Sequence, residues 1–142
     1  MPKFSFEKFI KSDVQKIFEI IKDYEKYQKL FPQYFPSVRV LSTRNEVSVV
    51  EEHMMLGDKE LVMMTKHILE SPLKHEIFVI GGDAKGTHII ETFENISQGT
   101  KLKVVADFKI KGKMLVSNLL GKNKIDKEYY EIINAFLKTR KI

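Results

Sequence analysis

The sequence predicts an α+β fold: an antiparallel sheet of about seven strands, two short helices after the first strand, and one long C-terminal helix. Three observations predict this fold. Residues 4–9 alternate as a strand does, residues 37–110 hold six more apolar stretches separated by turn residues, and after residue 112 the apolar period changes from two to about three and a half. With 142 residues and a hydrophobic fraction of 43%, we expect one domain over residues 1–142.

Two helices are predicted directly after the first strand. Ser12 opens a capping-box pattern, in which its hydroxyl would cap the first helix. Apolar residues recur at helical spacing from Val14 to Ile21, which predicts a helix from about Asp13 to Asp23. The same spacing continues from Tyr24 to Phe31 and predicts a second, short helix. Pro32 ends it, because proline disfavours helix at the preceding residue.

A run of strands follows, with spacings typical of an antiparallel meander. The predicted strands are Val38–Leu41, Val47–Leu56, Leu61–Leu69, Glu76–Ile80, His88–Phe93 and Lys101–Ile110. Glycine, asparagine and proline mark the turns between them. One turn, Gly81–Gly86, joins two strands and lacks the strand-to-helix context of a phosphate-binding loop, so we interpret it as a hairpin loop at the rim of the sheet.

The C-terminal helix is amphipathic. Its predicted inward face consists of Leu115, Leu119, Tyr129, Ile133 and Phe136. Lys122 and Asp126 interrupt this face with opposite charges at i,i+4 spacing, and they either pair with each other or hold the polar head of a ligand.

Composition excludes several classes of function. With no cysteine, the chain has no disulfides, thiolate metal sites or cysteine nucleophiles, and its four histidines show no spacing typical of a metal site, so we expect no metal and no cofactor. No apolar run reaches the ~20 residues that span a bilayer, and the N-terminus lacks the apolar segment of a signal peptide. We therefore expect a cytoplasmic protein.

The positive charge is concentrated in the C-terminal third. Residues 101–142 contain 11 Lys and Arg against 4 Asp and Glu, whereas residues 1–100 contain 13 against 15. One interpretation is a solvated lysine face. The other is transient contact with a membrane surface, RNA or an acidic protein through electrostatic attraction. Because this attraction does not depend on base sequence, we expect no sequence-specific nucleic-acid binding.

Several local phrases resemble the START-like superfamily, whose helix-grip fold is shared with the birch-pollen allergen. They are Ser12–Phe18, Asp23–Tyr27 leading to Phe31-Pro32, Leu69–Pro72, and Gly112–Leu115 at the start of the last helix. The order of elements also fits, and the chain is most similar to the polyketide cyclase and coenzyme-Q-binding branch. The resemblance implies a curved sheet wrapped around the long helix, with an apolar cavity between them. Members of this superfamily include lipid and quinone carriers, cyclases and protein-binding factors.

Three ionisable side chains are predicted to face that cavity. On each strand we take as inward the alternate set with fewer charges, which places His67 and Glu52 inside; for the sixth strand the resemblance favours the set with Phe93, which places Glu91 inside. In an apolar hollow their ionisation would be perturbed, as proton-transfer chemistry requires. The alternative is that each of the three lies at the edge of the sheet or is simply satisfied by a hydrogen bond, and a register slip of one residue would send either glutamate to solvent.

The predicted ligand-binding residues lie on these inward faces and around the short helices. They are Tyr27, Phe31, Met54, Met63, Thr65, His67, Ile77, Val79, Ile89, Glu91, Phe93, Leu102, Val104, Phe108, Leu115, Leu119 and Tyr129. The methionines are either an adaptable lining or plain core. Likewise, the aromatic residues around the short helices either admit a ligand, touch a membrane or fasten the helices to the sheet; they are Tyr27, Phe31, Tyr34 and Phe35.

Three functions remain open. The first is binding or transport of a hydrophobic small molecule, such as a lipid, an isoprenoid quinone or a polyketide-like compound, in an internal cavity. The second is a cyclase or dehydratase that uses His67, Glu52 or Glu91 for acid–base chemistry. The third is an interaction module that docks through its basic C-terminal surface.

Overall fold

The computed structural model describes residues 3–70, 74–110 and 122–138. Its elements, in chain order, are β1 (Lys3–Ile10), α1 (Val14–Ile21), α2 (Lys26–Leu30), β2 (Ser37–Arg44), β3 (Val47–Leu56), β4 (Lys59–Glu70), β5 (Lys74–Gly82), β6 (His88–Ile96), β7 (Gly99–Asp107) and α4 (Lys122–Leu137). The predicted α+β order of strand, two short helices, six strands and helix is confirmed. The predicted start of the last helix, with Leu115 and Leu119, lies outside the described residues.

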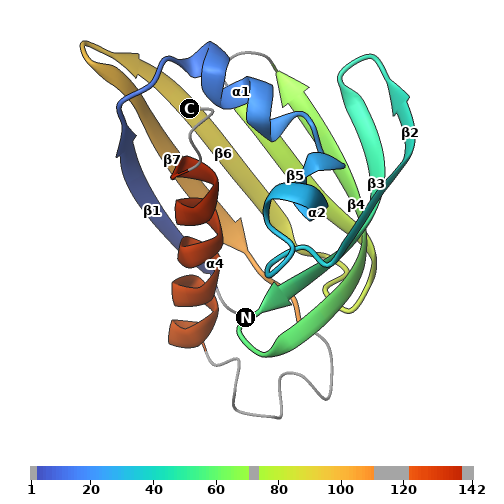
Figure 1. The fold of residues 1–142 in the computed structure, drawn as a ribbon. Helices are drawn as coiled ribbons and strands as arrows, with labels where there is room; N and C mark the ends of the chain where they lie inside the picture. Colours follow the sequence, from blue (N-terminus) through green and yellow to red (C-terminus); the bar gives the residue numbers. More distant parts are fainter. Residues whose placement is uncertain (1–2, 71–73, 111–121, 139–142) are drawn as a thin grey trace.

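All seven strands form one antiparallel sheet in the order β1-β7-β6-β5-β4-β3-β2. Strands β2 to β7 follow each other as a meander, and β1 pairs with β7 in a register that runs from Lys3 opposite Asp107 to Ile10 opposite Thr100. The sheet curves, and α1, α2 and α4 all lie on its concave side (Figure 1). None of the helices in the described ranges is both long and apolar enough to cross a membrane.

Each strand buries one face, as its alternation predicts. Along β3 the even-numbered residues from Ser48 to Leu56 are buried, and along β4 the odd-numbered residues from Leu61 to His67 are buried. Since residues of both strands that pair across the ladder share a face, the two sets line the same concave side. The inward orientation predicted for Glu52, His67 and Glu91 is the observed one, with exposures of 5%, 2% and 5%.

An irregular pairing bends the sheet between β4 and β5. The register shifts between Met64, opposite Gly81, and Thr65, opposite Val79. Gly82 there has φ +95°, and a Cβ on it would lie 2.1 Å from the carbonyl oxygen of Val62. Only glycine combines this positive φ with so close an approach, so the glycines of the turn allow β5 to stay against β4 where the sheet curves.

The first helix begins differently from the prediction. Asp13, rather than Ser12, is the N-cap: its backbone is extended (φ −75°, ψ 160°), and its side chain accepts a hydrogen bond of 3.0 Å from Lys16 N. The carbonyl of Ser12 accepts a hydrogen bond of 2.8 Å from the hydroxyl of Thr100 instead. This contact ties the start of α1 to β7, and Phe18 then packs edge-on against Phe93 with 5.0 Å between ring centroids.

The second helix is held by aromatic packing against α4. Rings of three residues in and after α2 surround Phe136: Tyr27 at 4.7 Å, Phe31 at 4.6 Å and Phe35 at 5.9 Å between centroids. Edge-on and tilted arrangements of this kind add to the stabilisation from apolar burial. These aromatic residues therefore fasten α2 to the C-terminal helix, a contact that the prediction did not include.

Candidate functional site

A cavity lies between the concave face of the sheet and the helices. Its lining comes from α1 (Ile17, Ile20, Ile21), from α2 and the segment after it (Tyr27, Phe35), from β3 to β5 (Glu52, Met54, Met63, Thr65, His67, His75, Ile77, Val79), from β6, β7 and flanking residues (Thr87, Ile89, Glu91, Leu102, Phe108), and from α4 (Tyr129, Ile132, Ile133, Phe136). The volume of the cavity is about 60 Å³, which gives room for a few waters.

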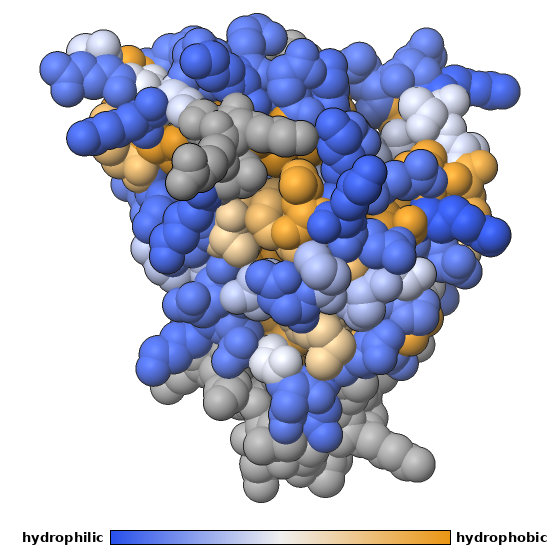
Figure 2. Space-filling model, in the orientation of Figure 1, coloured by the Kyte–Doolittle hydropathy of each residue, from blue (hydrophilic) through white to orange (hydrophobic). Residues whose placement is uncertain are grey.

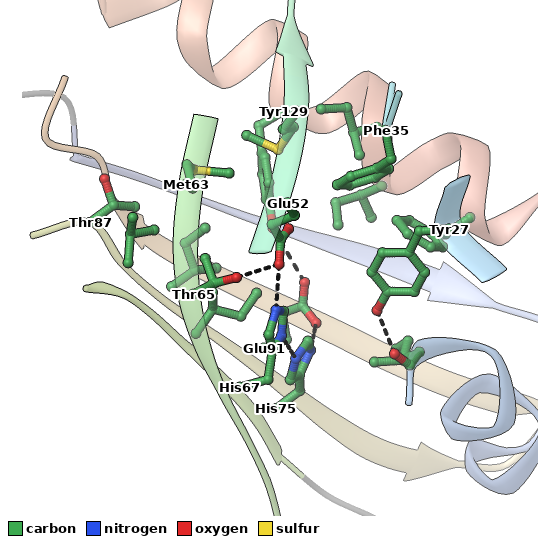
Figure 3. Close-up of a pocket in the computed structure, with 18 of the residues that line it drawn as sticks. Tyr27, Phe35, Glu52, Met63, Thr65, His67, His75, Thr87, Glu91 and Tyr129 are labelled. Atoms are coloured by element: carbon green, nitrogen blue, oxygen red, sulfur yellow. Dashed lines mark hydrogen bonds and ion pairs between the residues drawn. The ribbon is translucent and has the colours of Figure 1, made fainter. Parts of the chain in front are cut away.

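Four polar side chains meet inside this apolar lining, one from each of four neighbouring strands (Figure 3). Glu52 comes from β3, His67 from β4, His75 from β5 and Glu91 from β6. His75 and Glu91 are direct partners in the β5–β6 register. His67 lies opposite Ile77, so it reaches His75 along the diagonal of the β4–β5 pair, within the range of long side chains.

The four side chains form one continuous hydrogen-bonded chain. Glu52 Oε2 lies 2.8 Å from His67 Nε2, His67 Nδ1 lies 2.9 Å from His75 Nε2, and His75 Nδ1 lies 2.8 Å from Glu91 Oε1. The hydroxyl of Thr65 also donates to Glu52 Oε2. We call Glu52, His67, His75 and Glu91 the Glu–His–His–Glu chain. All four are at least nine-tenths buried, with exposures of 2–5%.

Burial and mutual contact set the ionisation of the first pair. Burial by itself raises the pKa of Glu52, but attraction to His67 and hydrogen bonds from His67 and Thr65 outweigh it, so the pKa of this carboxyl lies below its usual value. Burial lowers the pKa of His67, and the neighbouring Glu52 offsets this only in part. At neutral pH the pair is an ionised carboxylate that accepts a hydrogen bond from a neutral imidazole.

This ionisation fixes the direction of the next hydrogen bond. A neutral His67 that donates from Nε2 has a bare Nδ1, so the 2.9 Å contact requires His75 to donate from its Nε2. One more hydrogen then lies between His75 Nδ1 and Glu91 Oε1. If His75 holds it, the chain contains an imidazolium beside two carboxylates; if Glu91 holds it, both imidazoles are neutral. The two arrangements differ only by the transfer of one proton over one hydrogen bond.

Two tyrosines border the chain. The hydroxyl of Tyr129 lies 3.5 Å from Glu91 Oε2, and the ring of Tyr24 lies over His67 with 4.3 Å between centroids. Burial, followed by the nearby Glu91 and Glu52 charges, raises the pKa of Tyr129; burial, followed by the Glu52 and Glu91 charges, does the same for Tyr24. Both phenols are therefore neutral. The buried Tyr24 hydroxyl has no hydrogen-bond partner among residues 3–70, 74–110 and 122–138.

Most residues predicted from the sequence as ligand-binding line this cavity. They are Tyr27, Met54, Met63, Thr65, His67, Ile77, Val79, Ile89, Glu91, Leu102, Phe108 and Tyr129, together with Glu52, which was predicted as an acid–base group. Phe31, Phe93 and Val104 are buried but do not line it: Phe31 packs against a ring of α4, Phe93 packs against a ring of α1, and Val104 lies on β7 between its register partners on β1 and β6. The methionines divide between faces: Met54 and Met63 line the cavity, and Met55 and Met64 are only partly buried.

His75 is the functional candidate that sequence reasoning missed. The predicted strand began at Glu76, whereas β5 begins at Lys74 and puts His75 on the same face as Ile77 and Val79. Extending the period of two backwards by one step from Ile77 would have found it. No three His, Asp or Glu side chains within the described ranges are arranged to hold a metal ion, and the ring nitrogens of His67 and His75 are occupied by the hydrogen bonds above.

Two further predictions concern the rim and the last helix. The Gly81–Gly86 segment leads from the end of β5 toward β6, as predicted for a hairpin loop: Asp83 Oδ2 accepts a hydrogen bond of 2.9 Å from Val62 N, and Ala84 is fully buried. The structure describes the backbone of Lys122 but not its side chain, so the predicted pairing with Asp126 stays a prediction. Asp126 Oδ1 accepts a hydrogen bond of 2.9 Å from Lys127 N.

The family of the chain follows from comparison with known proteins. A family model described as polyketide cyclase / dehydrase and lipid transport matches residues 10–137, and the chain belongs to this family. The resemblance inferred from the local phrases is thereby confirmed at the level of the family. No curated protein matches the sequence.

Solved structures with START-like folds are similar over nearly the whole chain. The protein TTHA0849 from Thermus thermophilus has a TM-score of 0.77 at 14% identity, and the match covers 96% of this chain and 92% of that protein. A START superfamily protein from Mycobacterium smegmatis has a TM-score of 0.77 at 16% identity, with 94% and 92% covered. The Zhui aromatase/cyclase from Streptomyces sp. R1128 has a TM-score of 0.74 at 12% identity, with 95% and 90% covered. At these identities the likeness shows the fold.

Proposed function

We propose that this protein binds a hydrophobic small molecule in the cavity between the sheet and α4. The observation that carries the proposal is the lining, which consists mostly of apolar and aromatic side chains and contains one compact polar group, the Glu–His–His–Glu chain. Small-molecule sites typically combine an apolar wall with a few polar groups that orient the ligand. Membership of a family described by lipid transport and by polyketide cyclisation supports the same class of ligand.

The size of the cavity adds a requirement. About 60 Å³ is less than a lipid, a quinone or a polyketide-like molecule needs, so side chains must move when such a ligand enters. Met54 and Met63 are suited to this because unbranched thioethers adapt to different shapes. Hydrophobic residues also reach the surface near the middle of the face that carries α2 and α4, with hydrophilic residues beside them (Figure 2), and we take this patch as the place of entry.

Native mass spectrometry of freshly purified protein, followed by denaturing extraction, tests the proposal directly. We expect a defined apolar molecule, or binding of the neutral fluorophore N-phenyl-1-naphthylamine when the protein is empty. Val79 lines the cavity and its neighbour Ile80 is exposed, so Val79→Phe and Ile80→Phe make a matched pair. Val79→Phe should weaken binding ~10-fold or more by filling the cavity, and Ile80→Phe should leave it unchanged. Equal effects of the two variants, or no binding at all, would refute the proposal.

The Glu–His–His–Glu chain favours a second function, acid–base catalysis on a bound ligand. Its carboxylates are buried beside an apolar space, and a proton can pass along the chain between them. Such a site could remove the α-hydrogen of a ketone and return it, as cyclisation and dehydration chemistry requires. The test is exchange of the α-hydrogens of 2-tetralone with D₂O, followed by NMR. Exchange that is faster with the native protein than with Glu52→Gln or Glu91→Gln would support catalysis, and exchange no faster than with unfolded protein would exclude this reaction.

Docking through the basic C-terminal third remains a prediction. Parts of that region lie outside the described residues, and neither the fold nor the family adds support to it. Salt-dependent association with anionic vesicles or RNA would test it, since binding to phosphates weakens steeply with added salt.

A further inference from the structure

The number of hydrogens in the Glu–His–His–Glu chain determines its charge. Each of its three short contacts, of 2.8, 2.9 and 2.8 Å, joins two atoms with lone pairs and therefore needs one hydrogen. Two ionised carboxylates with two neutral imidazoles contain two hydrogens and carry a charge of −2. The third hydrogen makes the net charge −1, whichever of the four groups holds it. A fourth hydrogen would have to sit on a carboxylate oxygen, because every ring nitrogen is already engaged.

Among the side chains that line the cavity, the spare hydrogen-bonding capacity is on carboxylate acceptors; the Tyr24 hydroxyl, which has no partner among the described residues, belongs to a residue outside this lining. Within the described residues no hydrogen bond engages Glu52 Oε1, and Glu91 Oε2 meets only the Tyr129 hydroxyl at a long 3.5 Å. The other hydroxyl donors of the lining are directed at acceptors of the protein: Thr65 at Glu52 and the Val50 carbonyl, Tyr27 at the Ile21 carbonyl, and Thr87 at the Lys109 carbonyl.

We propose, on the basis of the binding function above, that the ligand carries a hydrogen-bond donor, a hydroxyl or a protonated amine, directed at Glu52 and Glu91, and that the cavity rejects carboxylates and phosphates. A donor on the ligand satisfies carboxylate oxygens that burial otherwise leaves with too few partners. An anionic head would instead lie beside a buried negative charge in an apolar surrounding, where repulsion is weakly screened.

A series of naphthalene derivatives with one ring system and different head groups tests this. The members are naphthalene, naphthalen-2-ylmethanol, naphthalen-2-ylmethylamine, which is a cation at neutral pH, and 2-naphthoate. Binding at pH 7.5 can be followed by naphthyl fluorescence because the protein contains no tryptophan. We expect the alcohol and the amine to bind ~10- to 100-fold more tightly than 2-naphthoate, the range of a charge-assisted hydrogen bond. The overall charge of +5 acts the other way, since it attracts the anion and repels the amine.

Glutamine variants show whether the chain causes the preference. Glu52→Gln keeps the shape and an acceptor for His67 but replaces one carboxylate oxygen by an amide donor, and Glu91→Gln does the same at the other end. Both variants should reduce the ratio of the affinity for the amine to the affinity for 2-naphthoate at least ~10-fold. The control is Glu51→Gln, whose partly exposed side chain lies on the outer face of β3, 3.8 Å from Arg39, and which should leave the ratio unchanged. Thermal unfolding of each variant establishes that it is folded.

The outcomes separate this inference from the proposed function. If naphthalene binds and 2-naphthoate binds as tightly as the alcohol and the amine, the head-group inference is wrong and the binding function stands. The head-group inference is also wrong if Glu51→Gln abolishes the preference for donors. It is likewise wrong if both Glu52→Gln and Glu91→Gln leave that preference intact. If neither naphthalene nor any derivative binds, the binding function itself fails and takes the head-group inference with it.

Discussion

The two faces of the sheet carry the same kind of hydrogen-bonded Glu–His contact in different surroundings. On the inner face His67 and Glu52 are 2.8 Å apart, and so are His75 and Glu91. On the outer face His53 and Glu60 are 2.7 Å apart, and His88 and Glu76 are 2.6 Å apart. The inner side chains are 2–7% exposed, whereas the outer ones are 17–46% exposed. The contact distance is therefore almost constant, and solvent access is what differs.

Solvent access decides what each pair contributes. Water and dissolved ions screen the outer pairs, and exposed pairs of this kind typically stabilise a protein by ~0–1 kcal/mol. The inner pairs lose their hydration, so each group depends on its partner and their ionisation is coupled. A hydrogen-bonded Glu–His contact is thus a surface detail on one side of the sheet and a functional candidate on the other. Three measurements would break or sharpen this contrast.

The largest expected effect is the loss of one partner from an inner pair. Glu52→Ala leaves the buried Nε2–H of His67 without its acceptor and opens space beside it, while the hydroxyl of Thr65 keeps the Val50 carbonyl as an acceptor. An unsatisfied buried donor typically costs ~1–3 kcal/mol and the cavity adds to this, so the free energy of unfolding should fall by ~2–4 kcal/mol. Glu60→Ala, the matched change on the outer face, should lower it by ~0–1 kcal/mol. Urea unfolding of both variants measures this, and equal losses would show that burial does not separate the two faces.

A smaller effect is expected from acid. The pKa of His67 is below its usual 6.5 and that of Glu52 is below its usual 4.5, so the unfolded chain binds more protons than the folded protein does. The free energy of unfolding should therefore fall as the pH drops below about 6.5, because His67 takes up a proton more readily in the unfolded chain. It should fall further below about 4.5, because the same holds for Glu52. Each decrease ends once the pH is below the pKa of that group in the folded protein.

Between pH 6.5 and pH 5 the His67 contribution amounts to at most ~2 kcal/mol, since one proton changes stability by ~1.4 kcal/mol per pH unit. His67→Asn should flatten this part of the profile, and the outer-face control His53→Asn should not. The measurement is the free energy of unfolding at a series of pH values. A His67→Asn profile as steep as that of the native protein would assign the acid sensitivity to other groups.

The smallest expected effect comes from two tyrosine hydroxyls near the chain. The buried Tyr24 hydroxyl lacks a partner in the described part of the protein, whereas the Tyr27 hydroxyl donates to the Ile21 carbonyl. Tyr24→Phe should therefore be neutral or raise the free energy of unfolding by up to ~1 kcal/mol, and Tyr27→Phe should lower it by about 1 kcal/mol. A loss in Tyr24→Phe as large as in Tyr27→Phe would show that the Tyr24 hydroxyl has a partner in solution.

The inner face of the sheet was largely predictable from local pattern. A period of two assigns each strand residue to a face once the less charged set is taken as inward, and this placed Glu52 and His67 correctly, whereas Glu91 was placed by the family resemblance. Local pattern predicted the ends of the elements less well. It predicted that β5 starts two residues later than it does, so His75 was missed. It also predicted that β7 continues to Ile110, whereas the strand ends at Asp107. It also chose Ser12 over Asp13 as the cap of α1, because both types cap well.

By itself, the sequence determined the order of elements, the buried face of each strand and the apolar character of the interior, because these follow from spacing along a single segment. Tertiary structure alone decided that four side chains up to 39 residues apart, from Glu52 to Glu91, join in one hydrogen-bonded chain. It also decided how little space α1 and α4 leave beside that chain. Both depend on strand register and on how helices pack against the sheet, which are relations between segments that no single segment encodes.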